Sequence, residues 1–186
     1  MRINFYALRA IYFHEMDRFR RTLIQSLLSP VLSTSLYFIV FGSVIGDYVQ
    51  KIDGISYGSY IVPGLLMLTL LTQSISNTSF GIFFPKFNGT IYEILAAPIS
   101  TVEIVIAYVG AGATKTLIVA AVIFCTSLFF AEVNVKFPLL MIFLLILVAL
   151  TFALFGFLIG LLSKNFEQMS IIPVSYTHLT LPTMLW

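Results

Sequence analysis

Few residues in this chain have the type and spacing that catalysis requires. Residues 112–116 (GATKT) partly match the end of a phosphate-binding loop, which needs a glycine directly before the lysine and another five residues earlier. Thr114 and Val109 occupy those positions, so the motif fails. His14 and His178 have no Cys, Asp or Glu around them at the spacing of metal ligands. We therefore expect no catalytic residue, no metal site and no cofactor bound by this chain itself.

The polar segment 86–100 (KFNGTIYEILAAPIS) is better suited to bind a partner, because it interrupts two long apolar runs. Thr90 and Glu93 have the spacing of a capping box, which predicts the start of a short helix, and Pro98 should end that helix. The helix would present one apolar ridge, formed by Ile91, Ile94 and Leu95. A helix this short is marginally stable alone, so we expect it to dock on a larger surface.

The composition indicates what kind of protein must position this segment. Apolar residues make up 59% of the chain and charged residues only 10%, which leaves too little polar surface for a water-soluble globule. Long charge-poor runs, each able to cross a bilayer, occupy residues 22–46, 60–84, 101–130 and 138–163. We therefore predict an all-α, polytopic membrane helix bundle with four transmembrane helices.

Some residues inside the spans predict departures from a simple apolar helix. Pro30 should kink the first span. Lys115 lies in the third span, and we expect its side chain to extend to the membrane surface so that the ammonium group stays in water. A polar stripe follows the second span at three- and four-residue steps, formed by Thr69, Gln73, Ser76 and Asn77. This stripe either lines a translocation pathway or hydrogen-bonds between packed helices, and the residues leave both interpretations open.

The N-terminal segment 4–21 has the pattern of an amphipathic helix. Its apolar side contains Phe5, Leu8, Tyr12, Met16 and Phe19. Its charged side contains Arg9, Asp17 and Arg20. We expect this helix to lie in the membrane surface, the alternative being a solvated helix. Because charges are dispersed among its apolar residues, a signal peptide is not expected.

The distribution of basic residues predicts how the chain is oriented. With a cytoplasmic N-terminus, most of them fall on the cytoplasmic side: Arg2, Arg9, Arg18, Arg20, Arg21, Lys86, Lys115 and Lys164. The opposite side then holds only Lys51 and Lys136. Because cytoplasmic loops carry an excess of Lys and Arg, we expect the N-terminus and segment 86–100 to be cytoplasmic.

Four blocks of this sequence resemble the membrane permease subunits of ABC-2 type exporters. They are YIVPGLL at residues 60–66, FNGTIYEILAAPIS at 87–100, YVGAGATK at 108–115 and KNFEQMSIIP at 164–173. The resemblance implies a six-span subunit, two copies of which assemble with two ATPase subunits that bind ATP and Mg²⁺. It also implies that the loop between the second and third spans is a coupling helix against the ATPase, formed here by Asn88, Gly89, Thr90, Ile91, Glu93, Ile94, Leu95 and Pro98.

The resemblance ends at Pro173, so we expect residues 1–173 to form an ABC-2 type transmembrane domain that is incomplete. In the family a fifth span would follow, so the resemblance implies that this chain contains only the start of a fifth transmembrane helix. After Pro173 the chain continues with VSYTHLTLPTMLW. The string SYTHLTLPT resembles translated sequencing-adapter read-through. We therefore expect residues 174–186 to be a non-native tail.

The resemblance implies a transport subunit without its own ATPase site. It would export a drug, lipid or polysaccharide-like substrate across the bacterial inner membrane, using ATP hydrolysed by a separate subunit. The implied partners are ABC ATPase subunits, a second permease subunit, identical or not, and the lipid bilayer, with no nucleic acid. The alternatives are a secondary transporter, which needs ionisable residues near mid-membrane that these spans lack, and a structural membrane subunit that transports nothing.

Overall fold

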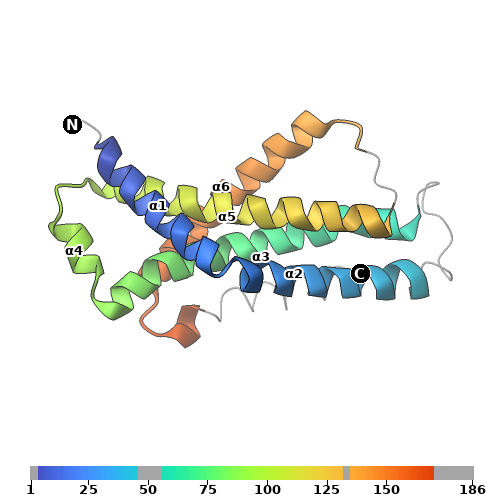
Figure 1. The fold of residues 1–186 in the computed structure, drawn as a ribbon, viewed down its shortest axis with the longest axis horizontal. Coiled ribbons are helices and arrows are strands. Elements are labelled where there is room, and N and C mark those ends of the chain that lie inside the picture. Colours follow the sequence, from blue (N-terminus) through green and yellow to red (C-terminus); the bar gives the residue numbers. More distant parts are fainter. Residues whose placement is uncertain (1–3, 46–55, 132–134, 170–186) are drawn as a thin grey trace.

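The computed structural model describes residues 4–45, 56–131 and 135–169, and this part of the chain consists of helices and their connections, without strands (Figure 1). The predicted all-α bundle is confirmed. The start of the expected fifth span and the expected non-native tail lie outside the described residues. In chain order the helices are α1 (Phe5–Arg21), α2 (Leu23–Tyr37), its π-helical continuation η1 (Phe38–Ile45), α3 (Tyr57–Asn88), α4 (Ile91–Ala96), α5 (Thr101–Phe130) and α6 (Pro138–Leu162).

Four stretches are long and apolar enough to cross a membrane, namely Leu23–Phe41, Tyr57–Asn88, Thr101–Phe130 and Pro138–Leu162. The third predicted span coincides with α5, but the prediction for the second span is wrong at both ends. α3 begins before residue 60 and continues through Pro85 to Asn88. Pro85 is buried, and its packing outweighs the hydrogen bond that a proline removes from a helix. Gly89, with φ of 81°, then ends the helix in the left-handed conformation that glycine adopts without strain.

α3 and α6 cross with their backbones in contact. A Cβ atom on Gly156 would lie 2.5 Å from a carbonyl oxygen of α3, and one on Gly160 would lie 2.6 Å from another. Next to this crossing, Ser74 Oγ donates a hydrogen bond to the Ala149 carbonyl oxygen at 2.7 Å. Only residues without side chains permit such an approach, so the two glycines determine how closely the second and fourth spans pack.

α5 packs against α3, α1, α6 and α2. Gly112 makes the contact with α3 possible, since a Cβ atom there would collide with the side chain of Thr78. The apolar core that joins these helices draws on α3, α5 and α6, and consists of Leu70, Ile82, Ile104, Tyr108, Val109, Ala113, Ala120, Ala149, Ala153 and Phe157.

The segment that follows α6 folds back onto the end of α3. The ring of Phe166 lies 4.9 Å from that of Phe83 and 5.0 Å from that of Phe87, in edge-to-face geometry. Lys86 Nζ donates to two carbonyl oxygens at the C-terminus of α6, at 2.6 and 2.9 Å. α3 and α6 therefore end at the same end of the bundle and are joined there.

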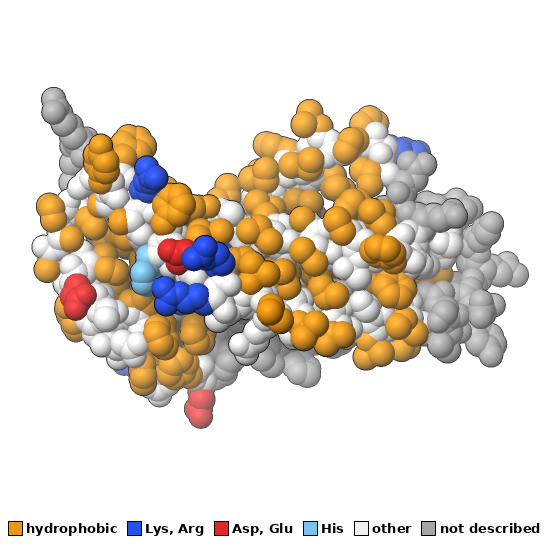
Figure 2. Space-filling model, viewed as in Figure 1, with side chains coloured by type: hydrophobic (Ala, Val, Ile, Leu, Met, Phe, Trp, Pro, Cys, Tyr) orange, Lys and Arg blue, Asp and Glu red, His pale blue; other side chains and the backbone are white. Residues whose placement is uncertain are grey.

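Charged and apolar side chains are segregated over the molecule. Most of the Lys, Arg, Asp and Glu side chains on the face in Figure 2 gather at the end that holds α1 and α4, whereas the remainder of that face is mainly hydrophobic. Along α2 the exposed apolar residues follow one stripe, formed by Ile24, Leu28, Leu32 and Leu36. A long apolar surface with charge at one end is the pattern of a membrane-embedded bundle.

The glycine crossing gives a testable prediction for Gly156. Gly156→Ala should lower the free energy of unfolding by about 1 to 3 kcal/mol, because the new methyl group would meet the backbone of α3. The matched control is Gly64→Ala, in which the new methyl group has open space and helix propensity improves. Thermal unfolding in detergent measures both variants. Equal stability of the two would show that the crossing is not close-packed.

Candidate functional site

The candidate site is the charged end of the bundle, where α4 connects the second and third spans. α4 projects from the end of α3, at the same end of the molecule as the start of α1 (Figure 1). Asn88 is the last residue of α3, and the left-handed turn at Gly89 redirects the chain into α4. α4 ends at Ala96, two residues before Pro98. The short helix predicted from this segment is therefore present.

The predicted capping box of this helix is wrong. Thr90 has helical backbone angles and its side chain makes no capping hydrogen bond to α4, since capping requires an extended residue. The reciprocal box belongs instead to Ser100 and Glu103 at the start of α5. Glu103 N donates to Ser100 Oγ at 3.3 Å, and Ser100 N donates to Glu103 Oε2 at 2.9 Å.

The apolar ridge predicted on α4 is divided between two environments. Ile91 and Ile94 are half-buried and pack against the chain's own core. Leu95 is 57% exposed and Tyr92 is 73% exposed, and Glu93 is exposed beside them. The exposed side of α4 therefore consists of Tyr92, Glu93, Leu95 and Ala96, without the two isoleucines.

α1 lies along α5 and runs in the same direction. At its start Asn4 N donates to Glu103 Oε1 at 2.6 Å. Farther along, the Tyr12 hydroxyl donates to Thr114 Oγ1 at 3.0 Å. At its end Phe19 is buried in a cluster with Val119 and Ile123 of α5. The carboxylate of Glu103 thus joins the start of α1 to the start of α5.

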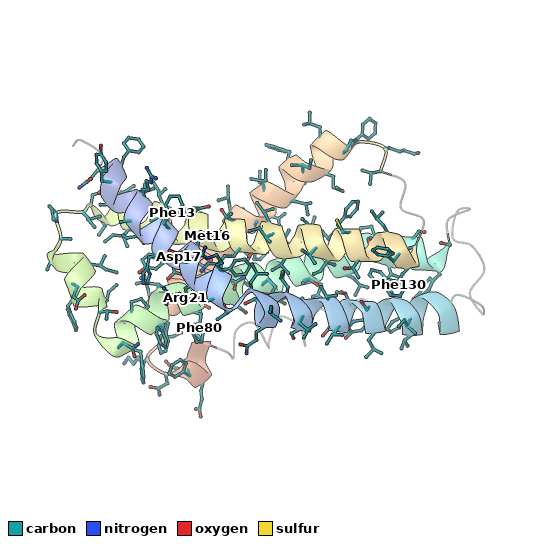
Figure 3. The ribbon with its side chains drawn as sticks, in the orientation of Figure 1. Phe13, Met16, Asp17, Arg21, Phe80 and Phe130 are labelled. Atoms are coloured by element: carbon teal, nitrogen blue, oxygen red, sulfur yellow. The ribbon has the colours of Figure 1, made fainter. Side chains whose placement is uncertain are left out.

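The burial of residues along α1 largely agrees with the apolar and charged sides predicted for this helix. Leu8, Tyr12 and Met16 are half-buried and Phe19 is buried, whereas Phe5 is exposed. Arg9 is exposed and stacks over the Phe13 ring at 5.3 Å. Phe13, Met16, Asp17 and Arg21 are labelled along this helix in Figure 3. The membrane-surface position of α1 stays a prediction.

The prediction for Lys115 is wrong, because its side chain is buried and does not reach a surface. Lys115 Nζ lies 2.7 Å from Oε2 of Glu15 on α1, and Arg18 Nη2 lies 2.9 Å from the same oxygen. The sequence contained a signal for this pair. Glu15 stands three residues after Tyr12 and four before Phe19, so it falls on the packed side of α1, opposite an isolated lysine in an apolar run.

The polar stripe of α3 makes no hydrogen bond to another described helix. Thr69 Oγ1 donates to the Leu65 carbonyl oxygen, and Asn77 Nδ2 donates to Gln73 Oε1 at 3.5 Å. Ser76 is exposed. The serine that does bond across helices is Ser74, which pattern analysis missed. A pathway-lining role for Thr69, Gln73, Ser76 and Asn77 stays a prediction.

The two glutamates of this region should differ in their effect on stability. Glu103→Ala removes the α5 cap and the bond to Asn4, so we expect a loss of about 1 to 2 kcal/mol in the free energy of unfolding. Glu93→Ala, at an exposed position, should change it by less than about 0.5 kcal/mol. Chemical unfolding in detergent compares them. A larger loss in the free energy of unfolding for Glu93→Ala than for Glu103→Ala would show that Glu93 caps α4 after all.

Comparison with known proteins identifies the family to which this arrangement belongs. The profile of the ABC-2 type transporter family matches residues 6–185. The inner membrane transport permease YadH of Escherichia coli (strain K12) is 37% identical over 173 residues, which cover 93% of this chain and 68% of that protein. The protein of the same name from Shigella flexneri matches to the same extent. No solved structure matches significantly. The chain therefore belongs to the ABC-2 type transporter family.

Proposed function

We propose that the chain is the membrane permease subunit of an ATP-driven exporter, with α4 as the helix that contacts a separate ATPase subunit. The observation that carries the proposal is the position of α4. It lies between the second and third spans at the charged end of the bundle, and its exposed face consists of Tyr92, Glu93, Leu95 and Ala96. Membership of a transporter family supports the transport role.

The mechanism we propose is the transmission of movement from the ATPase to the spans. ATP and Mg²⁺ bind on the partner, and closure of the ATPase subunits displaces α4. Because α4 joins α3 to α5 directly, both spans shift with it. The substrate class proposed is a drug, lipid or polysaccharide-like molecule, and a second permease subunit, identical or not, completes the pathway.

The proposed location is the bacterial inner membrane, with the N-terminus in the cytoplasm. The relatives named as inner membrane permeases support the location. The excess of basic residues at the end holding α1, Lys86 and Lys164 supports the orientation, since Lys136 lies before α6 at its opposite end.

Cysteine accessibility tests this orientation. In a Cys125→Ser background, single cysteines at positions 50 and 134 should react with a membrane-impermeant thiol reagent added outside spheroplasts. Cysteines at positions 9, 88 and 165 should react only after the membrane is opened. Labelling of position 88 from outside would place α4 away from any cytoplasmic ATPase.

Substitution of Leu95 tests the contact with the ATPase. Leu95→Asp places a charge on the exposed apolar part of α4, and a desolvated charge costs on the order of a few kcal/mol, so recovery of the ATPase in pull-downs should fall. Membrane insertion should be unchanged. The control is Phe137→Asp, which alters an exposed apolar residue before α6 at the opposite end.

Two results would contradict the proposal. If the ATPase is recovered equally with Leu95→Asp and the parent, α4 is only a connection. If no ATPase is recovered with the parent under conditions that preserve the membrane complex, the secondary transporter or the non-transporting subunit becomes the better description.

A further inference from the structure

A buried ion pair joins α1 to α5. Glu15 of α1 is 2% exposed and Lys115 of α5 is 3% exposed. Lys115 Nζ donates to Glu15 Oε2 at 2.7 Å. Arg18, whose side chain is 31% exposed, contributes a second cation 2.9 Å from the same oxygen. Among the described residues, no other ion pair has both partners buried.

The burial of this pair makes its separation costly. A charge removed from water needs a partner, and breaking a buried pair leaves the remaining charge without compensation. Arg18 can turn toward water because it is partly exposed, but Lys115 is enclosed by the helices. Movement of α1 away from α5 would therefore leave an unpaired ammonium group inside an apolar span.

A third helix closes this site. A Cβ atom on Gly81 of α3 would lie 3.4 Å from Glu15 Oε2, 3.6 Å from the Tyr108 ring and 3.8 Å from Arg18 Nη2. α3 therefore covers the carboxylate with a residue that has no side chain. The other carboxylate oxygen, Glu15 Oε1, is buried and has no hydrogen-bond partner among the residues that the structure describes. Both strong contacts of Glu15 depend on one oxygen, so the pair requires a specific placement of α1.

We propose that Glu15 and Lys115 are a positioning pair that fixes α1 on α5, so that the two helices move as one body. Tyr12 and Phe19 also contact α5, but a hydroxyl bond and an apolar contact tolerate sliding better than a buried ion pair does. The consequence is that a force on the exposed face of α1 reaches the third span directly. This inference rests on the contacts of α1 and does not depend on the identity of an ATPase partner.

Cross-linking between the two helices tests the pair. The parent carries Tyr12→Cys and Thr114→Cys in a Cys125→Ser background, since the two side-chain oxygens lie 3.0 Å apart. Membranes containing the chain are treated with a short bis-methanethiosulfonate reagent, and the yield of the linked peptides is measured by mass spectrometry. The test variants are Glu15→Gln, Lys115→Met and the two combined. The matched control is Asp17→Asn, which removes an exposed carboxylate from the same helix.

We expect each single variant to lower the yield by about tenfold or more, because each leaves one buried group without its charged partner. The combined variant should return to within about twofold of the parent, since neither charge then remains unpaired. Asp17→Asn should have no effect. A second cross-link, between Phe80→Cys and Phe166→Cys at two exposed positions, should keep its yield in every variant, because it reports α3 against the segment that follows α6.

The other outcomes each overturn the proposal. Unchanged yields in the single variants would show that the remaining contacts hold α1. An equal loss in the second cross-link would show that the pair supports the whole bundle instead of positioning α1. A loss in the combined variant equal to the product of the single losses would show that the two charges act independently, and an equal loss in Asp17→Asn would make the effect one of net charge.

Discussion

A polar group inside an apolar span must find its partner within the protein, because hydrocarbon offers no hydrogen bonds. Most span threonines satisfy this requirement on their own helix. Thr34, Thr116 and Thr126 each donate to the carbonyl oxygen four residues earlier, at 2.8 to 2.9 Å. This leaves apolar and small side chains to pack the helices together. Among the described residues, Ser74 differs from these threonines, because its hydroxyl donates to a backbone carbonyl oxygen of α6 and not of its own helix.

The same requirement applies to charged side chains, and among the described residues several of them join two helices. Glu15 and Glu103 each join α1 to α5, and Lys86 joins the last turn of α3 to the C-terminus of α6. α3 and α6 also meet through Gly156 and Gly160, and α3 meets α5 at Gly112. The bundle thus combines close backbone packing between its spans with electrostatic contacts that join α1 to α5 and α3 to α6.

The sequence predicted the features that depend on composition and local pattern. Apolar runs predicted the four spans, and turn residues predicted the short helix between the second and third spans. It could not predict that α3 would continue through Pro85, because tertiary packing overrides local propensity there. The capping box was assigned to Thr90 although Ser100 has the same spacing to Glu103, and the backbone angles that decide between them depend on the turn at Gly89.

The candidate site was predicted less completely, because its contacts join residues far apart in the chain. The spacing of residues 91–95 indicated an apolar ridge, but nothing local shows that Ile91 and Ile94 face the core while Leu95 stays exposed. Glu15 and Lys115 are 100 positions apart. Each could be recognised as an unusual charge near apolar residues, yet their pairing depends on the docking of α1 on α5.

The hydrogen bonds of Lys86 have a consequence for the electrostatics of the bundle. α3 and α6 end side by side, and each helix C-terminus carries roughly half a negative elementary charge from its aligned peptide dipoles. Two such termini side by side carry together about one negative elementary charge. The repulsion between them would destabilise the parallel arrangement of α3 and α6. Lys86 stands in the last turn of α3 and places its ammonium group on the terminal carbonyl oxygens of α6. A single cation thus offsets both helix dipoles and lets two spans of the same polarity end next to each other.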